Sequence, residues 1–217
     1  MKKPVLLIYS GGMDSYTLLH YLRAQGNHVQ ALSFDYGQKH KKELEYAIEE
    51  CDRLRMPHDI VQLGSLTQHL TGSALTDKSV AMPEGHYAAD NMKLTVVPGR
   101  NTIMLSIAMG IAQARGCSHV YFGAHAGDHH IYPDCRPQYF NDLQCVFDTA
   151  TEHAVVLGAP FLYKTKTEIL TIGLALGLDY GRSWTCYQGG EHPCGKCGAC
   201  VERAEAFEQN QAADPLL

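Results

Sequence analysis

The sequence predicts an α/β protein in which an open, mostly parallel sheet is covered by helices on both faces. Three observations indicate this class. Short apolar runs alternate with segments of helical periodicity along most of the 217 residues. A glycine-rich turn joins the first such pair, and no internal repeat or low-complexity tract interrupts the order. This alternation is typical of parallel sheets, which bind ligands at the carboxyl ends of their strands.

The elements follow one another in a regular order. Residues 5–9 form a short apolar run that predicts a buried strand, and residues 14–24 follow as an amphipathic helix. Residues 64–97 have weak periodicity and predict a long, partly helical excursion. Thr165 is a helix N-cap candidate because Glu168 follows three residues later, as in a capping box. Further strands are expected at residues 28–35, 59–63, 119–123 and 154–157, and further helices at 41–54, 101–115, 138–151, 165–176 and from 201.

Composition narrows the class of protein. Apolar residues make up 45% of the chain and charged residues 19%, an ordinary globular balance. The formal net charge of −5 argues against a protein whose main task is to grip a long nucleic acid. No apolar stretch is long enough for a membrane span, and the apolar run at the start is too short for a signal peptide. We therefore expect a cytoplasmic protein.

The turn after the first strand, residues 10–15, reads Ser-Gly-Gly-Met-Asp-Ser. A strand, a glycine turn and a helix start direct main-chain N–H groups toward a phosphate. The hydroxyls of Ser10, Ser15 and Thr17 add donors, and Asp14 is suited to cap the helix or to hold Mg²⁺. The turn carries no lysine and so differs from the P-loop. A plain tight turn with a helix cap is the alternative interpretation.

Four of the eight cysteines lie close together near the C-terminus: Cys186, Cys194, Cys197 and Cys200. Zinc takes four thiolates in a tetrahedron, and an all-cysteine set is typical of a closed, structural site. An iron–sulfur cluster is the alternative metal group, and a disulfide pair is a weaker one. We expect residues 1–180 to form the main domain, and residues 181–217 to form a zinc-binding segment whose C-terminal helix packs on it.

The turn at 10–15 resembles the phosphate loop of the ATP-pyrophosphatase (PP-loop) enzymes, which hold the β- and γ-phosphates of ATP and leave the α-phosphate open to attack. Residues 34–40, 97–101 and 132–137, with Thr-Cys-Tyr at 185–187, extend the resemblance to the 7-cyano-7-deazaguanine synthase family. It covers residues 5–207 and implies an adenine nucleotide alpha hydrolase-like fold. The ATP-binding residues it implies are Tyr9, Ser10, Gly11, Gly12, Met13, Asp14, Ser15, Tyr16, Thr17, Phe34, Tyr36 and Gln38.

The resemblance also implies a reaction. ATP adenylates the carboxylate of 7-carboxy-7-deazaguanine, and ammonia displaces AMP to give the amide. A second ATP activates the amide oxygen, and loss of AMP leaves the nitrile, which serves queuosine or archaeosine synthesis. The implied cofactors are ATP, Mg²⁺ and structural Zn²⁺. The expected assembly is a homodimer that contacts neither nucleic acid nor membrane directly.

Several residues are candidates for this chemistry. Asp14 belongs to the phosphate loop, and Arg100, Arg136 and Lys166 are cations that could stabilise charge on the α-phosphate. Asp128 or Asp134 could accept the N–H groups of a guanine-like edge. Surface ion pairs and loop caps are the alternatives for these residues. In the family a small Ser-Gly pair often precedes the motif at 132–136, whereas larger residues stand here; His125, His129 and His130 are open as metal ligands, proton shuttles or polar loop lining.

Alternative functions remain open at this point. A relative could stop at the amide, or could pass the activated deazaguanine to another amine. A tRNA-thiolating PP-loop enzyme also adenylates its substrate, but the acidic charge and the short chain argue against it. A non-catalytic zinc-ribbon binding module is the third possibility, against which the intact Ser10, Asp14 and Ser15 argue.

Overall fold

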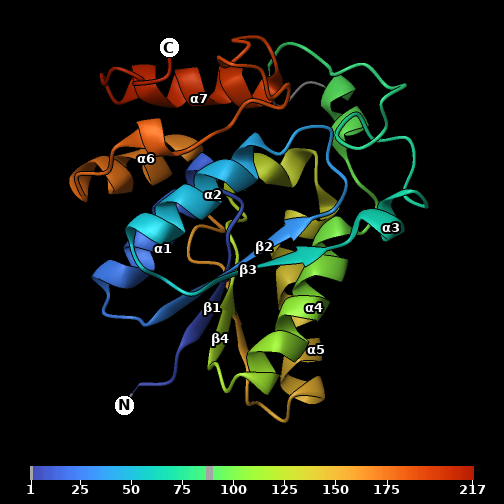
Figure 1. The fold of residues 1–217 in the computed structure, drawn as a ribbon, viewed down its shortest axis with the longest axis vertical. Coiled ribbons are helices and arrows are strands. Elements are labelled where there is room, and N and C mark those ends of the chain that lie inside the picture. Colours follow the sequence, from blue (N-terminus) through green and yellow to red (C-terminus); the bar gives the residue numbers. More distant parts are fainter. Residues whose placement is uncertain (1, 87–89) are drawn as a thin grey trace.

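The computed structural model of the chain, which describes residues 2–86 and 90–217, contains a five-stranded parallel sheet (Figure 1). The strand order is β3-β2-β1-β4-β5. The strands are β1 (Val5–Ile8), β2 (Val29–Asp35), β3 (His58–Gln62), β4 (His119–Tyr121) and β5 (Val156–Gly158). Every pairing between neighbouring strands is parallel. The fold class predicted from the alternation of elements is therefore confirmed.

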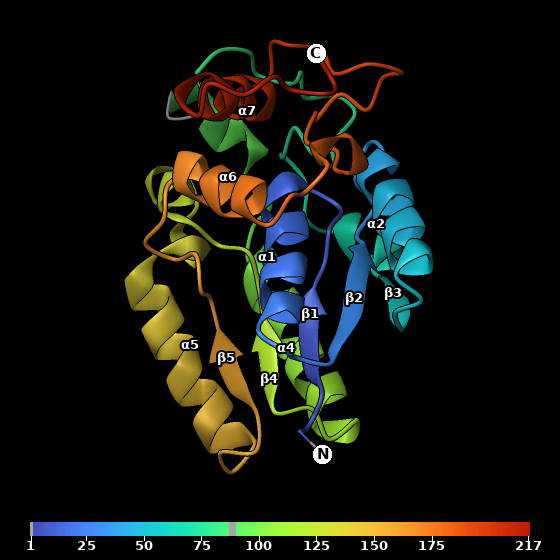
Figure 2. The ribbon, with the colours of Figure 1, turned by 90° about the vertical axis from the view of Figure 1, so that its left-hand side faces the viewer.

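Helices cover the sheet on both sides. The α-helices are α1 (Met13–Ala24), α2 (Lys42–Arg53), α3 (Gly64–Thr67), α4 (Arg100–Ala114), α5 (Pro137–Ala150), α6 (Lys166–Ala175) and α7 (Gly198–Gln209). The 3₁₀ turns are η1 (Asp90–Thr95), η2 (Ala126–His130), η3 (Pro133–Cys135) and η4 (Tyr180–Arg182). In Figures 1 and 2, α1, α2 and α6 lie on one side of the sheet and α4 and α5 on the other. Helix α7 lies beyond α6, at the end of the molecule that carries the C-terminus.

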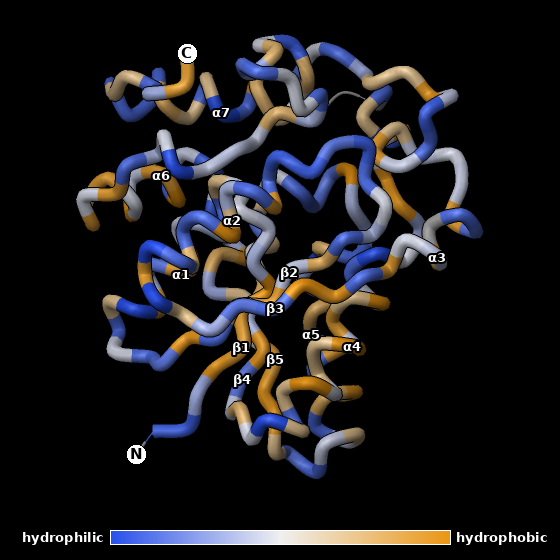
Figure 3. Tube along the Cα trace, in the orientation of Figure 1, coloured by the Kyte–Doolittle hydropathy of each residue, from blue (hydrophilic) through white to orange (hydrophobic). Residues whose placement is uncertain are grey.

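Two hydrophobic cores result from this layering. Side chains alternate along β1, so Leu6 packs in the core that includes α4 and α5, while Val5 and Leu7 pack in the core that includes α1 and α6. The strands appear as the apolar centre of the molecule in Figure 3. Parallel strands buried on both faces need apolar residues in succession, which explains the continuous run at residues 5–8.

The sheet changes direction at β1. From β1 the chain adds β2 and β3 on one side, then returns to add β4 and β5 on the other. Such a switch point opens a crevice at the carboxyl ends of the two strands that part there, β1 and β4. The glycine turn at 10–15 follows β1 directly and therefore lies at this crevice.

Element boundaries differ from expectation in a few places. Helix α7 begins at Gly198 with Cys197 as its N-cap, three residues before the expected start, so Cys200 lies in its first turn. The excursion at 64–97 contains α3 and η1. The capping box at Thr165 and Glu168 is confirmed, since the Thr165 hydroxyl accepts from the Glu168 N–H and the Glu168 carboxylate from the Thr165 N–H.

The segment after α6 is tied to the start of the chain. The main-chain N–H of Trp184 donates to the Gly11 carbonyl oxygen at 3.0 Å. Arg203, which is buried on α7, donates to the carbonyls of Tyr180 and Ser183. Phe207 of α7 packs in the same core as α1 and α6. The cysteine-bearing segment is thus held against the glycine turn at residues 10–15, the candidate phosphate loop.

Candidate active site and candidate metal centre

A cavity of about 240 Å³ opens at the carboxyl ends of the strands. Ile8 at the end of β1 and Phe122 after β4 contribute to its floor. Residues from the phosphate loop, from α2, α4 and α6, and from the cysteine-bearing segment complete the wall. A volume of this size in a parallel α/β fold, at the switch point of the sheet, is the expected place for a small-molecule ligand.

The phosphate loop requires its glycines. Gly11 has φ of 87°, and a Cβ atom there would overlap the main-chain carbonyl oxygen of Glu43. The Ser10 and Ser15 hydroxyls bond each other at 3.0 Å, and the Gly12 N–H donates to the Ser10 hydroxyl. No side chain caps α1 at Gly12, and Met13, Asp14 and Ser15 line the cavity. The start of α1 is therefore available to phosphate oxygens.

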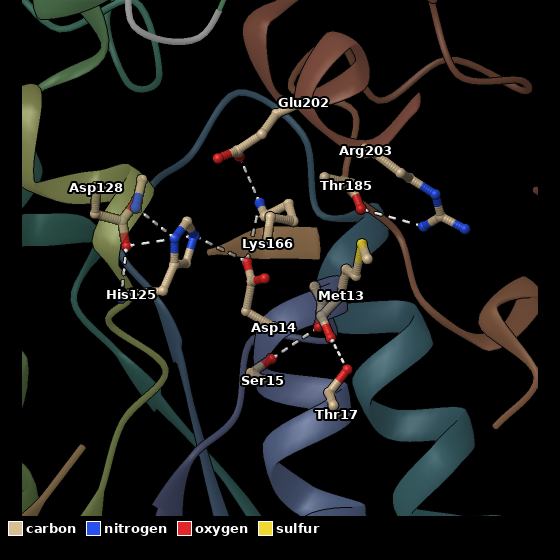
Figure 4. Close-up of polar contacts among 12 residues, drawn as sticks. Met13, Asp14, Ser15, Thr17, His125, Asp128, Lys166, Thr185, Glu202 and Arg203 are labelled. Carbon is tan, nitrogen blue, oxygen red and sulfur yellow. Dashed lines mark hydrogen bonds and ion pairs between the residues drawn. The ribbon is translucent and has the colours of Figure 1, made fainter. Parts of the chain in front are cut away.

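A cluster of buried charges adjoins the loop (Figure 4). The Lys166 ammonium lies 3.1 Å from an Asp14 carboxylate oxygen and 2.7 Å from a Glu202 oxygen. Burial alone would lower the pKa of Lys166, but Asp14 and Glu202 outweigh it and hold that pKa above its usual value. Burial would likewise raise the pKa of Asp14, and Lys166 and His125 reverse this to a lowered value. Asp14 and Lys166 are accordingly both charged.

His125 belongs to the same cluster. Its Nε2 atom lies 3.6 Å from both the Asp14 and the Asp128 carboxylates, and its side chain is buried. Burial lowers its pKa, but Asp128 and then Asp14 raise it to about 9 overall. The neighbouring carboxylates therefore favour the protonated ring, but protonation gives up the hydrogen bond that Nδ1 accepts from the Gly127 N–H.

Arg100 faces the same cavity from the start of α4. Its guanidinium lies 5.7 Å from the Tyr36 ring centre and 5.9 Å from the Tyr132 ring centre, within cation–π range. Its Nη1 atom donates to the Tyr36 hydroxyl at 3.4 Å. The two rings hold the cation in place without neutralising it, which leaves its charge for an anionic ligand.

Glu43, in the first turn of α2, is a further carboxylate of the cavity wall. Burial is the main cause that raises its pKa to about 8. A Cβ atom on Gly12 would lie 3.6 Å from Glu43 Oε1, so the carboxyl group borders the phosphate loop.

Many of the site residues predicted from the sequence line this cavity, and others lie outside its lining. Those that line the cavity are Ser10, Gly12, Met13, Asp14, Ser15, Tyr36, Gln38, Arg100, Asp128 and Lys166. Those outside its lining are Tyr9, Gly11, Tyr16, Thr17, Phe34, Asp134 and Arg136. His125 lines the cavity, whereas His129 and His130 do not.

The residues outside the lining have structural contacts. Tyr9, Tyr16 and Phe34 are core residues, and the Thr17 hydroxyl bonds the Met13 carbonyl and the Tyr180 hydroxyl. Asp134 accepts from the main-chain N–H of Asn101 in the first turn of α4. Arg136 is exposed and donates to the His129 carbonyl. Asp134 thus caps a helix start, which was the alternative interpretation for it.

Some residues of the site carried no signal in the sequence. Glu202 lies on α7, two residues after Cys200, and nothing in the cysteine motif connects it with Lys166, which it contacts at 2.7 Å. Glu43 lies inside an ordinary amphipathic helix. Thr185 and Tyr187 also line the cavity; the Thr-Cys-Tyr stretch at 185–187 marked them as part of the family resemblance but did not assign them to the site.

The four cysteines of the C-terminal segment meet at one point. The sulfur atoms of Cys186, Cys194, Cys197 and Cys200 all lie within 4.8 Å of one another, and those of Cys194 and Cys200 are 3.9 Å apart. A zinc tetrathiolate with bonds of about 2.3 Å has sulfur–sulfur edges of about 3.8 Å. Main-chain N–H groups of residues 188, 194, 196 and 197 donate to these sulfurs. The four sulfurs could hold a metal ion.

Comparisons with known proteins agree with this arrangement. The family model described as "Queuosine biosynthesis protein QueC" matches residues 4–211. The "7-cyano-7-deazaguanine synthase" of Pseudoalteromonas translucida is 53% identical over 216 residues, which cover 100% of this chain and 99% of that protein. The "7-cyano-7-deazaguanine synthase" of Hahella chejuensis is 54% identical over 209 residues, 96% of this chain and 90% of that protein.

Proposed function

The chain belongs to the QueC family of queuosine biosynthesis proteins, and from this premise we propose how its cavity carries out the reaction for which the relatives are named. The protein is an ATP-dependent synthase of 7-deazaguanine biosynthesis. Its substrates are 7-carboxy-7-deazaguanine, ATP and ammonia, and its product is 7-cyano-7-deazaguanine. One observation carries the assignment: a bare glycine turn and the Asp14–Lys166 ion pair, which Glu202 supports from behind Lys166, face the same cavity.

Adenylation is the first step that this cavity supports. A carboxylate is a poor electrophile, so its oxygen must first become part of a leaving group. The Gly12, Met13 and Ser15 region binds the β- and γ-phosphates as a unit and leaves the α-phosphorus exposed to the substrate oxygen. Lys166 and Arg100 stabilise the negative charge that develops there. Asp14 holds Lys166 in position.

Ammonia and a second ATP complete the reaction. Ammonia attacks the acyl carbon and AMP leaves, which gives the amide. The amide oxygen then attacks the α-phosphorus of the second ATP, and departure of the second AMP leaves the carbon–nitrogen triple bond. Two AMP and two pyrophosphate molecules form for each nitrile.

Recognition of the deazaguanine edge falls to Asp128 rather than Asp134. Asp128 lines the cavity, whereas Asp134 lies outside its lining and accepts from the start of α4. The larger residues His129 and His130 also lie outside the lining, so they give no reason to prefer an enzyme that stops at the amide.

The metal ions have distinct places. Zn²⁺ fits the four cysteine sulfurs, and its part is to stabilise the segment that carries Thr185 and Tyr187 into the cavity. Asp14 would be the protein ligand of the Mg²⁺ that accompanies ATP, since its Oδ2 atom contacts Lys166 and His125 while its Oδ1 atom has no hydrogen-bond partner among the described residues. The phosphate-binding candidates Gly11, Tyr16 and Thr17 act by shaping the loop and α1, since their side chains or main chain pack beneath it.

The setting of the enzyme follows from the same resemblance. We propose a cytoplasmic homodimer that acts on free small molecules and not directly on nucleic acid. In the described part of the chain no helix is long and apolar enough to span a membrane. Sedimentation equilibrium at several protein concentrations tests the dimer.

A direct assay tests the proposed reaction. The protein is incubated with ATP, 7-carboxy-7-deazaguanine and an ammonium salt, and AMP and the product mass are followed. We expect AMP release that requires the deazaguanine and a product with the mass of the nitrile. A product with the mass of the amide, or release of no AMP, would refute the assignment.

Asp14→Asn tests the role of the charge cluster. Without the Asp14 charge, Lys166 turns to Glu202 alone, so adenylation should fall at least about 100-fold. The fold should persist because Lys166 and His125 each keep another carboxylate partner. Substrate-dependent exchange of pyrophosphate into ATP measures this step. The exposed Asp52→Asn on α2 is the control, and equal exchange by the two variants would contradict the role of Asp14.

A further inference from the structure

In the part of the chain that the structure describes, Glu43 differs from the other acids of the cavity in having no ion-pair partner. Three carboxylates line the cavity: Asp14, Glu43 and Asp128. The Asp14 carboxylate pairs with Lys166 and with the His125 ring. The Asp128 carboxylate also pairs with the His125 ring, and it accepts a hydrogen bond from the main-chain N–H of His125. Within residues 2–86 and 90–217, no hydrogen bond or ion pair involves the Glu43 carboxyl group. A carboxyl group kept free in a cavity of paired charges calls for an explanation.

The position of Glu43 is fixed by its helix. The carbonyl of Glu43 lies directly against Gly11, so that only a glycine fits beneath it, and its Oε1 atom would lie 3.6 Å from a Cβ on Gly12. The first turn of α2 is therefore packed on the phosphate loop. The carboxyl group lies in the wall of the cavity, beside the turn at residues 10–15.

We propose that Glu43 is the general base of the ammonia-dependent half of the reaction, which removes protons from the incoming nitrogen. This assignment rests on the proposed function, because only that function brings ammonia to the cavity. It goes beyond it in giving a specific task to a residue outside the phosphate loop and outside the zinc segment.

The chemistry requires such a group. The nitrogen lone pair of ammonia forms the new C–N bond while the C–O bond to AMP breaks and its electrons leave with the phosphate. One N–H proton passes to the Glu43 carboxylate, and the neutral amide remains. After the second adenylation, two further N–H protons must leave as the C–O bond to AMP breaks and the nitrile forms. All three protons of ammonia are lost, and each passes through a base to solvent.

The electrostatics of Glu43 suit this task. Arg100 on α4 and Lys166 on α6 favour its charged form, whereas Asp14 on α1 and Cys186 of the cysteine cluster oppose it. Burial is the largest influence, and the net result is a pKa of about 8. A base with a pKa near the working pH combines a useful fraction of carboxylate with enough proton affinity to drive the transfer. Asp14, whose pKa is lowered, would be too weak a base.

Glu43→Gln separates the two halves of the reaction. The amide keeps the shape of the side chain and removes the base. We expect exchange of pyrophosphate into ATP, which needs only 7-carboxy-7-deazaguanine, to stay within about threefold of wild type. Ammonia-dependent product formation should fall about 100-fold or more, the usual contribution of a general base. Glu45→Gln, an exposed position of the same helix, is the matched control and should retain both activities.

Two outcomes of this comparison overturn the proposal. Product formation by Glu43→Gln within threefold of wild type would show that no base is needed there. Loss of pyrophosphate exchange that is restored by raised Mg²⁺ would make Glu43 a metal ligand of the nucleotide instead. If the wild-type protein itself forms no product, the proposed function fails, and this result is distinct from a defect confined to Glu43→Gln.

A second measurement needs no variant. The amide, 7-amido-7-deazaguanine, replaces the acid and ammonium as the substrate. The protonation of free ammonia therefore does not contribute to the pH dependence of the rate. We expect kcat/KM for nitrile formation to fall about tenfold per pH unit as the pH drops below about 8, because the base is then protonated. A rate that is constant from pH 6 to pH 9 would overturn the assignment even if Glu43→Gln did not fold.

Discussion

At the scale of single residues, the neighbours of each acidic group set its charge. Asp14 and Glu43 line one cavity, yet Lys166 and His125 hold the pKa of Asp14 low, while burial raises that of Glu43 to about 8. Two carboxyl groups with separated pKa values are a common basis for two different tasks in one active site. Here Asp14 contacts a lysine, and the raised pKa of Glu43 is the basis of the proton-transfer role proposed above.

His125 makes the stability of the fold depend on pH. Its pKa of about 9 lies above the unfolded value of about 6.5, so the protonated form contributes fully below about pH 6.5. That contribution is less than about 3 kcal/mol, because protonation gives up the hydrogen bond that Nδ1 accepts from the Gly127 N–H, and it is lost as the pH rises through 9. We expect the Tm of wild type to fall more steeply between pH 6.5 and pH 9.5 than that of His125→Asn. His153→Asn, at an exposed position, should keep the wild-type slope, and equal slopes for all three proteins would contradict the ion-pair role.

At the scale of elements, the packing of α2 on the phosphate loop depends on Gly11. Gly11 and Gly26 both have positive φ, but a Cβ on Gly26 meets nothing within 4 Å, whereas one on Gly11 overlaps the backbone of α2. Gly26→Ala should therefore lower the free energy of unfolding by only about 1 kcal/mol, the cost of placing alanine in the left-handed conformation. Gly11→Ala should cost about 3 kcal/mol or more. Urea unfolding measures the free energy of unfolding of both variants. Equal decreases for Gly11→Ala and Gly26→Ala would show that α2 moves away from residue 11 at no cost in stability.

The cysteine cluster is a second element-scale feature. Cys197→Ser removes one of four converging sulfurs, so the variant should bind less than one zinc per chain and unfold at a lower temperature. Adenylation should decline as well, because Thr185 and Tyr187 reach the cavity from the same segment. Elemental analysis and calorimetry provide the readouts. Cys145→Ser, which is exposed and outside the cluster, should keep the metal; iron with a visible absorption band in the wild type would favour an iron–sulfur cluster instead.

At the scale of the whole molecule, one buried ion pair connects the last residues of the chain to α7 and to the segment that precedes the cysteines. Arg203 donates to both carboxylate oxygens of Asp214, at 2.7 and 2.8 Å, and both side chains are almost fully buried. The same guanidinium bonds the Ser183 and Thr185 side chains. The pair thereby joins α7, the last residues and the segment that enters the cavity.

Removal of the Asp214 charge should leave the buried Arg203 guanidinium without its ion-pair partner. In Asp214→Asn the buried Arg203 charge loses its counter-ion, which typically costs about 3 to 5 kcal/mol. We expect a lower midpoint of thermal unfolding and a single transition for the whole chain, since α7 shares a core with α1 and α6. Glu208→Gln, at an exposed position on α7, should unfold like wild type. An unchanged midpoint in Asp214→Asn would show that the tail is not fastened by this pair.

Much of the fold and part of the site could be predicted from local pattern. The apolar run at 5–8, the glycine turn at 10–15 and the capping box at Thr165 are short-range signals, and each stands where it was expected. Tyr9, Tyr16 and Phe34 were placed with the nucleotide because they adjoin its motifs. Alternation along strand and helix turns these side chains into the core instead, and only the orientation of each element decides that.

The sequence by itself determined the parallel α/β class, the glycine turn at residues 10–15, the cysteine cluster and the family, because each depends on residues that are close together in the chain. Only the tertiary structure decided which charges meet. Lys166 contacts Asp14 of α1 and Glu202 of α7, and Asp134 accepts from the first turn of α4. Among the residues that the structure describes, the Glu43 carboxyl group has no hydrogen-bond or ion-pair partner. The charge state of a buried group depends on distance in space and on burial, and neither can be read from separation along the chain.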